Sequence, residues 1–200
     1  MAKILITAFE PYGPWKANAS WLALVELTRQ LPAQHSVTTR LYPVDVAVVQ
    51  RKLEEDLAAQ FDLALHLGQA PGSTHVQFEA IGINVARHPD APTAAGRPLV
   101  TDGPIAFGSQ LPLETWTQRL CERGIPARVS YHAGTYLCNA ILYSSHYAIQ
   151  RNGWKTKAGF IHLPVEISQA ASHPTPLPSL SKETAATALK LVLEQVDSVV

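Results

Sequence analysis

Charged residues are scarce in this sequence, and neither sign dominates. Lysine plus arginine number 16, as do aspartate plus glutamate, and together they make up 16% of the 200 residues. No segment concentrates positive charge, so the electrostatic pattern of a nucleic-acid-binding protein is missing. The chain also lacks an apolar run approaching the roughly 18 residues of a membrane-spanning helix. We therefore expect neither a nucleic acid nor a membrane among its partners.

Cysteine is also rare, since Cys121 and Cys138 are the only two in the chain. The first residues pass directly into a strand-like run, without the apolar length or the cleavage pattern of a signal peptide. We therefore expect a cytoplasmic protein. Because the cytosol keeps thiols reduced, a lone disulfide is not expected, and each thiol is interpreted separately.

Apolar runs with the character of strands alternate with segments that carry apolar residues at helical spacing. This alternation predicts a mostly parallel sheet covered by helices on both faces. A chain of 200 residues suits one compact unit, so we expect a single α/β domain over residues 1–200. The expected strands are 3–9, 37–43, 61–67, 76–85, 127–132 and 159–163, and the expected helices are 18–30, 46–59, 113–123, 138–151 and 182–196.

A proline-rich loop at about residues 86–112 interrupts this alternation. Proline removes a backbone donor and breaks helices and strands, so no long regular element is expected there. A loop of this length inside one domain is usually functional or lies at an interface, and we expect a lid or a subunit arm. Its five prolines are Pro89, Pro92, Pro98, Pro104 and Pro112.

The two cysteines differ in their local context. Cys121 lies beside the apolar face of the helix expected over 113–123, which favours a buried structural thiol. Cys138 follows a turn at 133–135 and opens the next helix. The unpaired amides of a helix N-terminus favour the thiolate, which is the nucleophilic form of cysteine. Cys138 is therefore the candidate nucleophile, while simple packing is the alternative role for a cysteine at such a turn.

A nucleophilic thiol needs a base, and the sequence offers eight histidines. His162 is the best placed, at the C-terminal end of a predicted strand, where parallel sheets present their active sites. His66 lies inside an apolar strand and is interpreted as a buried neutral imidazole bonded to the backbone. Glu79 is a carboxylate in an apolar run, where burial is costly without a partner. It fits a structural ion pair, an exposed face of an edge strand, or the group that orients the base of a catalytic triad.

These residues lie in motifs that resemble those of the pyroglutamyl peptidase family, and the likeness extends over nearly the whole chain. The most specific pair is AGTYLCN at 133–139 followed by GFIHLP at 159–164. Further matching segments are ILITAFEPYG at 4–13, NAS at 18–20, LGQA at 67–70, FEAIGIN at 78–84, LP at 111–112, GIP at 124–126 and PSLS at 178–181, with Tyr143.

The resemblance implies a three-layer α/β/α sandwich, assembled as a homotetramer, that hydrolyses the amide bond after an N-terminal pyroglutamyl residue of peptides. It implies no metal and no organic cofactor. On matching positions the family's nucleophile, histidine and glutamate fall on Cys138, His162 and Glu79. Arg87 is an approximate match to an arginine that is thought to help stabilise the oxyanion. The pocket for the flat lactam ring, with its apolar walls, falls on Phe9, Tyr12, Gln69, Tyr136 and Leu137.

Several positions differ from the family pattern. Ser73 stands where the turn usually has arginine, Ala80 stands where arginine commonly follows the glutamate, and the segment after Asn84 differs in residues and register. These differences motivate two alternatives: a catalytically weakened family member that binds small lactams or peptides, and a thiol amidase of different acyl specificity. A metalloenzyme is disfavoured, because no H-E-x-x-H or comparable ligand spacing occurs.

Overall fold

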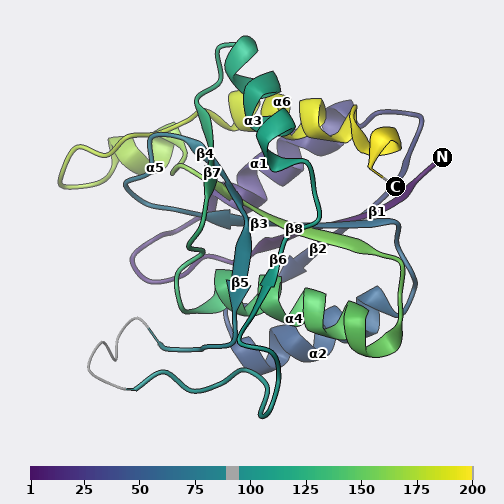
Figure 1. Ribbon diagram of the computed structural model, residues 1–200. Helices are drawn as coiled ribbons and strands as arrows, with labels where there is room; N and C mark the ends of the chain where they lie inside the picture. Colours follow the sequence, from purple (N-terminus) through teal and green to yellow (C-terminus); the bar gives the residue numbers. More distant parts are fainter. Residues whose placement is uncertain (89–94, 200) are drawn as a thin grey trace.

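The computed structural model describes residues 1–88 and 95–199. A six-stranded sheet with the strand order β2-β1-β3-β8-β4-β7 runs through its centre (Figure 1). Neighbouring strands are parallel except for β4 and β8, which are antiparallel. The mostly parallel sheet predicted from the sequence is therefore confirmed. The strands are β1 (Lys3–Phe9), β2 (Ser36–Tyr42), β3 (Leu63–Gln69), β4 (Val76–Glu79), β7 (Ala127–Ser130) and β8 (Lys157–Leu163).

Helices cover both faces of this sheet and complete the predicted three-layer sandwich (Figure 1). Side chains alternate between the two faces, so Ile4 and Ile6 of β1 join one hydrophobic cluster and Leu5 joins the other. Burial on both faces is the reason that β1, β3 and β8 are largely apolar runs in the sequence. Within the described residues, no helix is both long and apolar enough to cross a bilayer. One face carries α1 (Ala19–Leu27), α3 (Leu113–Glu122) and α6 (Lys182–Leu193), and the other carries α2 (Val46–Leu57) and α4 (Leu137–Asn152).

Local sequence signals set the ends of these helices. The side chain of Asp45 accepts a hydrogen bond from the backbone N–H of Val48 and caps α2. Gly153 ends α4 with a φ of 65°, a left-handed conformation that glycine adopts without steric cost. The helix predicted over 18–30 is α-helical only to the end of α1, and the 3₁₀ helix η1 (Thr28–Gln30) continues it.

The strand predicted over 76–85 is divided at Ala80, so the expectation of one continuous strand is wrong. β4 ends at Glu79, and the chain then leaves the central sheet. It forms β5 (Ile81–Ile83), which pairs with β6 (Ala106–Gly108) in a separate antiparallel hairpin. An alternating pattern cannot show such a corner, because the period of two continues through it.

Backbone hydrogen bonds and a close helix contact hold this corner in place. The Ala80 N–H donates to the Ser130 carbonyl, and the Ala80 carbonyl accepts from the Ser109 N–H. Gly82 then lies directly against α4, since a Cβ at this position would be 2.8 Å from the backbone nitrogen of Tyr143. The hairpin therefore packs on the start of α4 rather than extending the sheet.

The proline-rich loop lies partly outside the described residues, which leave out Pro89 and Pro92. Its described part contains the short strand β6 and a single bridge between Ala86 and Arg97. Figure 1 shows this part extending past α2 and α4, away from the central sheet. Its role as a lid or a subunit arm stays a prediction.

A buried polar bridge connects β1, β3 and α4. The two ring nitrogens of His66 each lie 2.8 Å from a hydroxyl group, one from Thr7 and one from Ser145. The sequence-based expectation of backbone partners is wrong, because the neighbouring strand and helix supply side-chain hydroxyls. Burial, with a smaller contribution from His146, lowers the pKa of His66 to about 3, so this imidazole is neutral at physiological pH.

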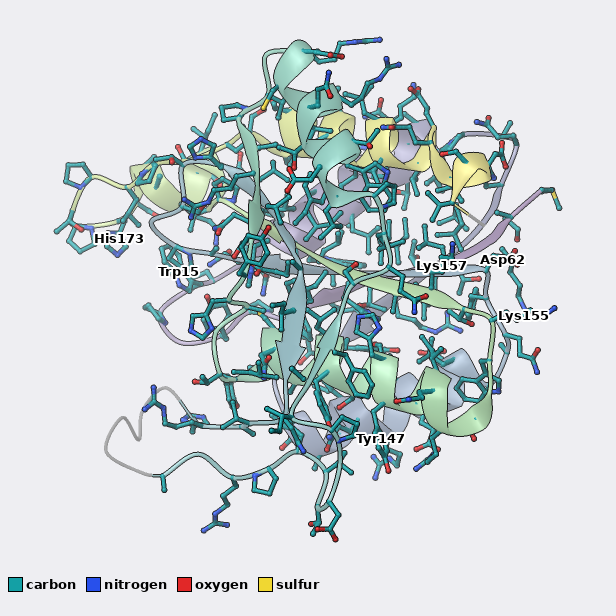
Figure 2. All side chains as sticks on the ribbon, viewed as in Figure 1. Trp15, Asp62, Tyr147, Lys155, Lys157 and His173 are labelled. Carbon is teal, nitrogen blue, oxygen red and sulfur yellow. The ribbon has the colours of Figure 1, made fainter. Side chains whose placement is uncertain are left out.

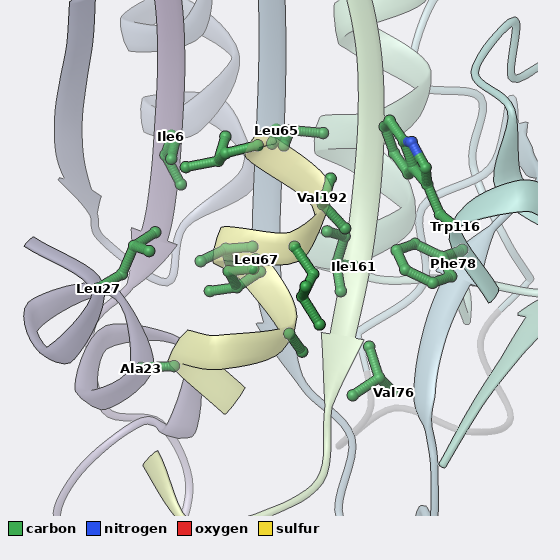
Figure 3. Packing of buried hydrophobic residues seen from close by; sticks show 14 of the residues in the cluster. Ile6, Ala23, Leu27, Leu65, Leu67, Val76, Phe78, Trp116, Ile161 and Val192 are labelled. Carbon is green, nitrogen blue, oxygen red and sulfur yellow. The ribbon is translucent and has the colours of Figure 1, made fainter. Parts of the chain in front are cut away.

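The largest fully buried side chain, Trp116 on α3, packs against β4 (Figure 3). Its ring centroid lies 5.7 Å from that of Phe78, and the two planes are tilted by 58°. Phe78 immediately precedes Glu79 in β4, so this aromatic pair holds the strand that carries the predicted catalytic carboxylate. Packing on one face of the sheet thereby helps to position the Glu79 side chain on the other face.

Replacing Trp116 by alanine should lower the free energy of unfolding by about 3 to 5 kcal/mol, because the buried cavity is refilled only in part. Denaturant unfolding followed by circular dichroism measures this change. The matched control is Thr115→Ala, an exposed neighbour on the same helix, which should change the free energy by less than about 0.5 kcal/mol. A loss below about 1 kcal/mol for Trp116→Ala would contradict its place in the core.

Candidate active site

The predicted base and its carboxylate meet on the antiparallel strands β8 and β4. The register pairs Phe160 with Glu79 and His162 with Gln77, which brings the two charged groups diagonally together on one face. His162 Nδ1 lies 2.7 Å from Glu79 Oε1. Only 1% of Glu79 and 8% of His162 is exposed to solvent. The buried carboxylate therefore has a partner for one of its two oxygens, Oε1.

The thiol of Cys138, the second residue of α4, lies over the neighbouring strand β3. A Cβ added to Gly68 would be 3.0 Å from the Cys138 sulfur and 2.5 Å from the Phe160 ring, so only glycine leaves room there. Gly68 is paired with His162 in the register of β3 and β8. His162 also interacts electrostatically with Cys138, and this interaction raises the pKa of His162. The carboxylate, the imidazole and the thiol thus form one interacting series, in which Glu79 is hydrogen-bonded to His162.

The electrostatics of this series favour a protonated imidazole. Burial lowers the pKa of His162, but the negative charge and hydrogen bond of Cys138, followed by those of Glu79, outweigh burial and raise the pKa to about 10. Because Nδ1 faces Glu79, Nε2 is the ring nitrogen that is left for the thiol. The imidazole of His162 is therefore protonated at neutral pH.

Asn139 is a site residue that was not predicted from the sequence. Its side chain is fully buried next to Cys138, where Oδ1 accepts from the Ile83 N–H at 2.8 Å. Its Nδ2 donates to the carbonyls of Ile83 and Val85, at 2.9 Å each. These bonds tie the start of α4 to the β5 hairpin and fix the position of the thiol. The partners lie 54 and 56 residues away in the sequence, so no local pattern reveals them.

A cavity of about 220 Å³ opens beside the thiol, and Cys138 forms part of its wall. It lies where β1, β2 and β3 end, between the loop after β1 and the loop before α4. All five residues that the family resemblance places in a lactam pocket line it, namely Phe9, Tyr12, Gln69, Tyr136 and Leu137. The structure adds Asn18, Val44, Ala133, Gly134 and Thr135, which come together only when the strand ends meet.

Polar groups in this cavity are few, and Tyr12 is one of them. Burial, followed by the negative charge of Cys138, raises the pKa of Tyr12 to about 12, against a smaller lowering by the Gln69 amide. The hydroxyl therefore keeps its proton at neutral pH. It is available as a hydrogen-bond donor to a ligand in the cavity.

An aromatic stack lies close to this end of the molecule. Trp15, in the loop between the cavity residues Tyr12 and Asn18, stacks on His173 with ring centroids 5.4 Å apart (Figure 2). His173 follows the short helix α5 (Ile167–Ala171), which the sequence did not predict. The stack connects the loop after β1 with the segment after β8.

Arg87 is not among the residues that line the cavity. It is exposed, and its backbone N–H donates to the Thr135 carbonyl at 2.6 Å. This bond ties the segment after β5 to the loop that precedes Cys138. The suggested oxyanion role of the Arg87 side chain stays a prediction.

Cys121 is exposed, so the expectation of a buried structural thiol is wrong. Leu120 takes the buried position in the last turn of α3, and Cys121 is turned to the edge of the helix. Its sulfur lies 3.6 Å from the Ala127 carbonyl. Helical spacing places a residue beside an apolar face but does not show whether another element covers it.

A thiol, an imidazole and a carboxylate that interact in series beside a small apolar cavity define the class of cysteine hydrolases. The model of the pyroglutamyl peptidase family matches residues 2–198, and the chain belongs to this family. A pyrrolidone-carboxylate peptidase of Chromobacterium violaceum is 38% identical over 202 residues, with 97% of this chain and 92% of the relative covered. One from Yersinia pestis is 33% identical, with 96% and 92% covered.

Solved structures of the family have the same fold. The pyrrolidone carboxyl peptidase of Fervidobacterium islandicum superposes with a TM-score of 0.93 at 31% identity, and both chains are covered completely. The enzyme of Thermococcus litoralis gives a TM-score of 0.87 at 31% identity, with 99% of this chain and 96% of that chain covered. The α/β architecture expected from the resemblance is therefore confirmed.

Removing the thiol should lower the pKa of His162, because Cys138 supplies the largest contribution that raises it while burial remains. We expect the imidazole proton resonances of His162 to titrate at clearly lower pH in Cys138→Ala than in the wild type. NMR titration measures this, and Cys121→Ala is the matched control that should leave the titration unchanged. Identical His162 titrations in the wild type and Cys138→Ala would disprove the coupling.

Proposed function

We propose that this protein is a cysteine peptidase that hydrolyses the amide bond after an N-terminal pyroglutamyl residue of peptides. The observation that carries the proposal is the series from Glu79 through His162 to Cys138, with the thiol in the wall of the apolar cavity. Family membership supplies the acyl group, because the relatives are named for pyrrolidone carboxylate. A small ring with few polar groups suits a cavity of about 220 Å³ with apolar walls.

In the acylation step, the Cys138 thiolate attacks the pyroglutamyl carbonyl carbon and forms a carbon–sulfur bond and an oxyanion. When the oxyanion collapses, the carbon–nitrogen bond breaks and the imidazolium of His162 gives its proton to the leaving amine. In deacylation, water loses a proton to His162 and attacks the thioester. The second collapse releases pyroglutamic acid and restores the thiolate beside the imidazolium.

Glu79 holds the ring of His162 in this cycle. Its Oε1 accepts from Nδ1–H, which keeps Nε2 toward the thiol and stabilises the protonated ring. The neutral ring that forms after proton transfer to the leaving amine stays oriented by the same bond. Glu79 does not need to change its own protonation state.

Backbone amides at the start of α4 are the oxyanion donors in this proposal. The hydrogen-bond ladder of the helix begins with the Ala140 N–H, which donates to the Tyr136 carbonyl, so the N–H groups of Cys138 and Asn139 lie outside it. A donor of this kind contributes about 3 kcal/mol to transition-state stabilisation. Arg87 remains a second candidate donor.

Two of the positions that differ from the family pattern, Ser73 and Ala80, are accommodated locally, which supports a peptidase over a binding protein without activity. The Ser73 hydroxyl donates to the His75 carbonyl and accepts from Gln77 Nε2, so it sits in a satisfied network. Ala80 packs against the hydrophobic cluster of α3 and α6. Neither position interrupts the contact between Glu79 and His162.

A homo-oligomer, with four subunits by resemblance to the family, is part of the proposal. Ile105, which precedes β6 in the proline-rich segment, is 88% exposed, and Tyr131 is 69% exposed. A subunit contact that covers these two side chains would remove their apolar surface from water. We propose a cytoplasmic location as well, because a nucleophilic thiol has to remain reduced.

The purified protein should release p-nitroaniline from pyroglutamyl p-nitroanilide. Cys138→Ala should lower kcat/KM by on the order of 10³-fold or more, because the covalent step is lost. Glu79→Gln should lower kcat more than it raises KM, since the carboxylate orients the base and does not touch substrate. Steady-state kinetics with this substrate measure both effects.

Cys121→Ala is the control and should keep the wild-type rate. A silent wild type, or an active Cys138→Ala beside an inactive Cys121→Ala, would overturn the proposal. Alkylation by iodoacetamide near neutral pH adds a second comparison. Cys121 is the more exposed thiol, so faster alkylation of Cys138 reports thiolate character rather than access.

A further inference from the structure

Two glutamine side chains meet behind the wall of the cavity. Gln69, in the wall, ends β3, and Gln169 lies on α5; they are 5% and 6% exposed. Gln69 Oε1 accepts two hydrogen bonds, one from the Ala19 N–H at 2.7 Å and one from Gln169 Nε2 at 2.8 Å. The two amides are 100 residues apart in the sequence.

Backbone donors fix which end of each amide is the oxygen. The Ala19 N–H can only donate, so the group that faces it must be the oxygen of Gln69. Likewise, the Glu166 N–H donates to Gln169 Oε1 at 2.8 Å, which turns Gln169 Nε2 toward Gln69 and toward the Ala17 carbonyl, 3.0 Å away. Neither amide can flip without losing a bond to an obligate donor.

The other end of Gln69 is therefore an N–H donor, on a residue that lines the cavity. Gln69 Nε2 is buried and has no hydrogen-bond partner among residues 1–88 and 95–199. Its amide also lowers the pKa of Tyr12, whose hydroxyl shares the cavity. A buried donor without a partner is costly, and a ligand with an acceptor at this point removes that cost. A pyroglutamyl ring offers its lactam carbonyl oxygen.

We infer that Gln169 is a positioning residue that fixes Gln69 as a donor and thereby selects ligands whose ring carries a carbonyl group. This inference rests on the proposed function for the identity of the ring, but its geometry stands apart from the catalytic series. Gln169 does not line the cavity and acts through Gln69 alone. A prolyl ring lacks the carbonyl and leaves the donor unpaired.

Gln169→Glu replaces the N–H donor that faces Gln69 by an acceptor oxygen, with almost no change in the shape of the side chain. One carboxylate oxygen still accepts from the Glu166 N–H, but the other then faces Gln69 Oε1 and the Ala17 carbonyl, which are both acceptors. Gln69 relieves the repulsion by turning its amide, and its oxygen then faces the cavity. Gln69→Glu places an acceptor at the same point without touching α5, so the two variants should behave alike.

The test uses pyrrolidone, the free lactam ring, to protect Cys138 from iodoacetamide, with each cysteine followed by mass spectrometry. In the wild type, pyrrolidone should slow alkylation of Cys138 and leave Cys121 unaffected. In Gln169→Glu and Gln69→Glu, the pyrrolidone concentration for half protection should rise about tenfold or more. Gln169→Leu removes the hydrogen bond to Gln69 Oε1 without placing an acceptor there, so the pyrrolidone concentration for half protection should rise less.

Ser172→Ala is the matched control for α5, because Ser172 bonds to carbonyls of this helix and is exposed. Pyrrolidone should protect Cys138 in Ser172→Ala as in the wild type, and this variant should alkylate at the wild-type rate without pyrrolidone. Protection in every other variant is measured against the alkylation rate of that same variant without pyrrolidone. Equal protection in Gln169→Glu and wild type would overturn the inference. A larger effect for Gln169→Leu than for Gln169→Glu would also overturn it, because loss of helix docking would then be the cause.

Failure of this inference is separable from failure of the proposed function. If the wild type hydrolyses pyroglutamyl p-nitroanilide while pyrrolidone still protects Cys138 fully in Gln169→Glu, the proposed function is supported and the inference is wrong. Conversely, pyrrolidone could protect wild-type Cys138 in a way that depends on Gln69 and Gln169 while the wild type hydrolyses no pyroglutamyl amide. That result would support the inference and contradict the proposed function.

Discussion

The buried contact between Glu79 and His162 is the constraint from which much of the structure follows. A carboxylate that is 1% exposed needs a partner in place, and the antiparallel insertion of β4 beside β8 supplies it. The one antiparallel pairing in the central sheet therefore coincides with the contact between the imidazole and the carboxylate.

The same contact also influences the path of the chain after Glu79. The chain leaves the sheet at Ala80, packs Gly82 on the backbone of α4, and receives the side chain of Asn139. That side chain lies next to Cys138, so the hairpin that begins after the carboxylate also positions the thiol. Two of the three groups in the series are thus placed by one stretch of chain, and the third, His162, by the strand beside it.

The sequence predicted the features that depend on neighbouring residues. The Asp45 cap, the glycine end of α4, and the strand that carries His162 are all encoded within a few positions. Family motifs placed five residues that line the cavity. Other features could not be predicted, because they depend on contacts between elements that lie far apart in the sequence. They are the corner at Ala80, the hydrogen bonds of Asn139 to the β5 hairpin, and the exposure of Cys121.

The neutral bridge formed by His66 has a consequence for the whole molecule. His66 and His162 lie on adjacent strands, yet their pKa values of about 3 and about 10 fall on opposite sides of the range in which histidine normally titrates. In the resting protein, neither ring changes its charge when the pH moves between mildly acidic and mildly alkaline values. The core thus contains two imidazoles of opposite charge state on adjacent strands, with His66 neutral and His162 protonated.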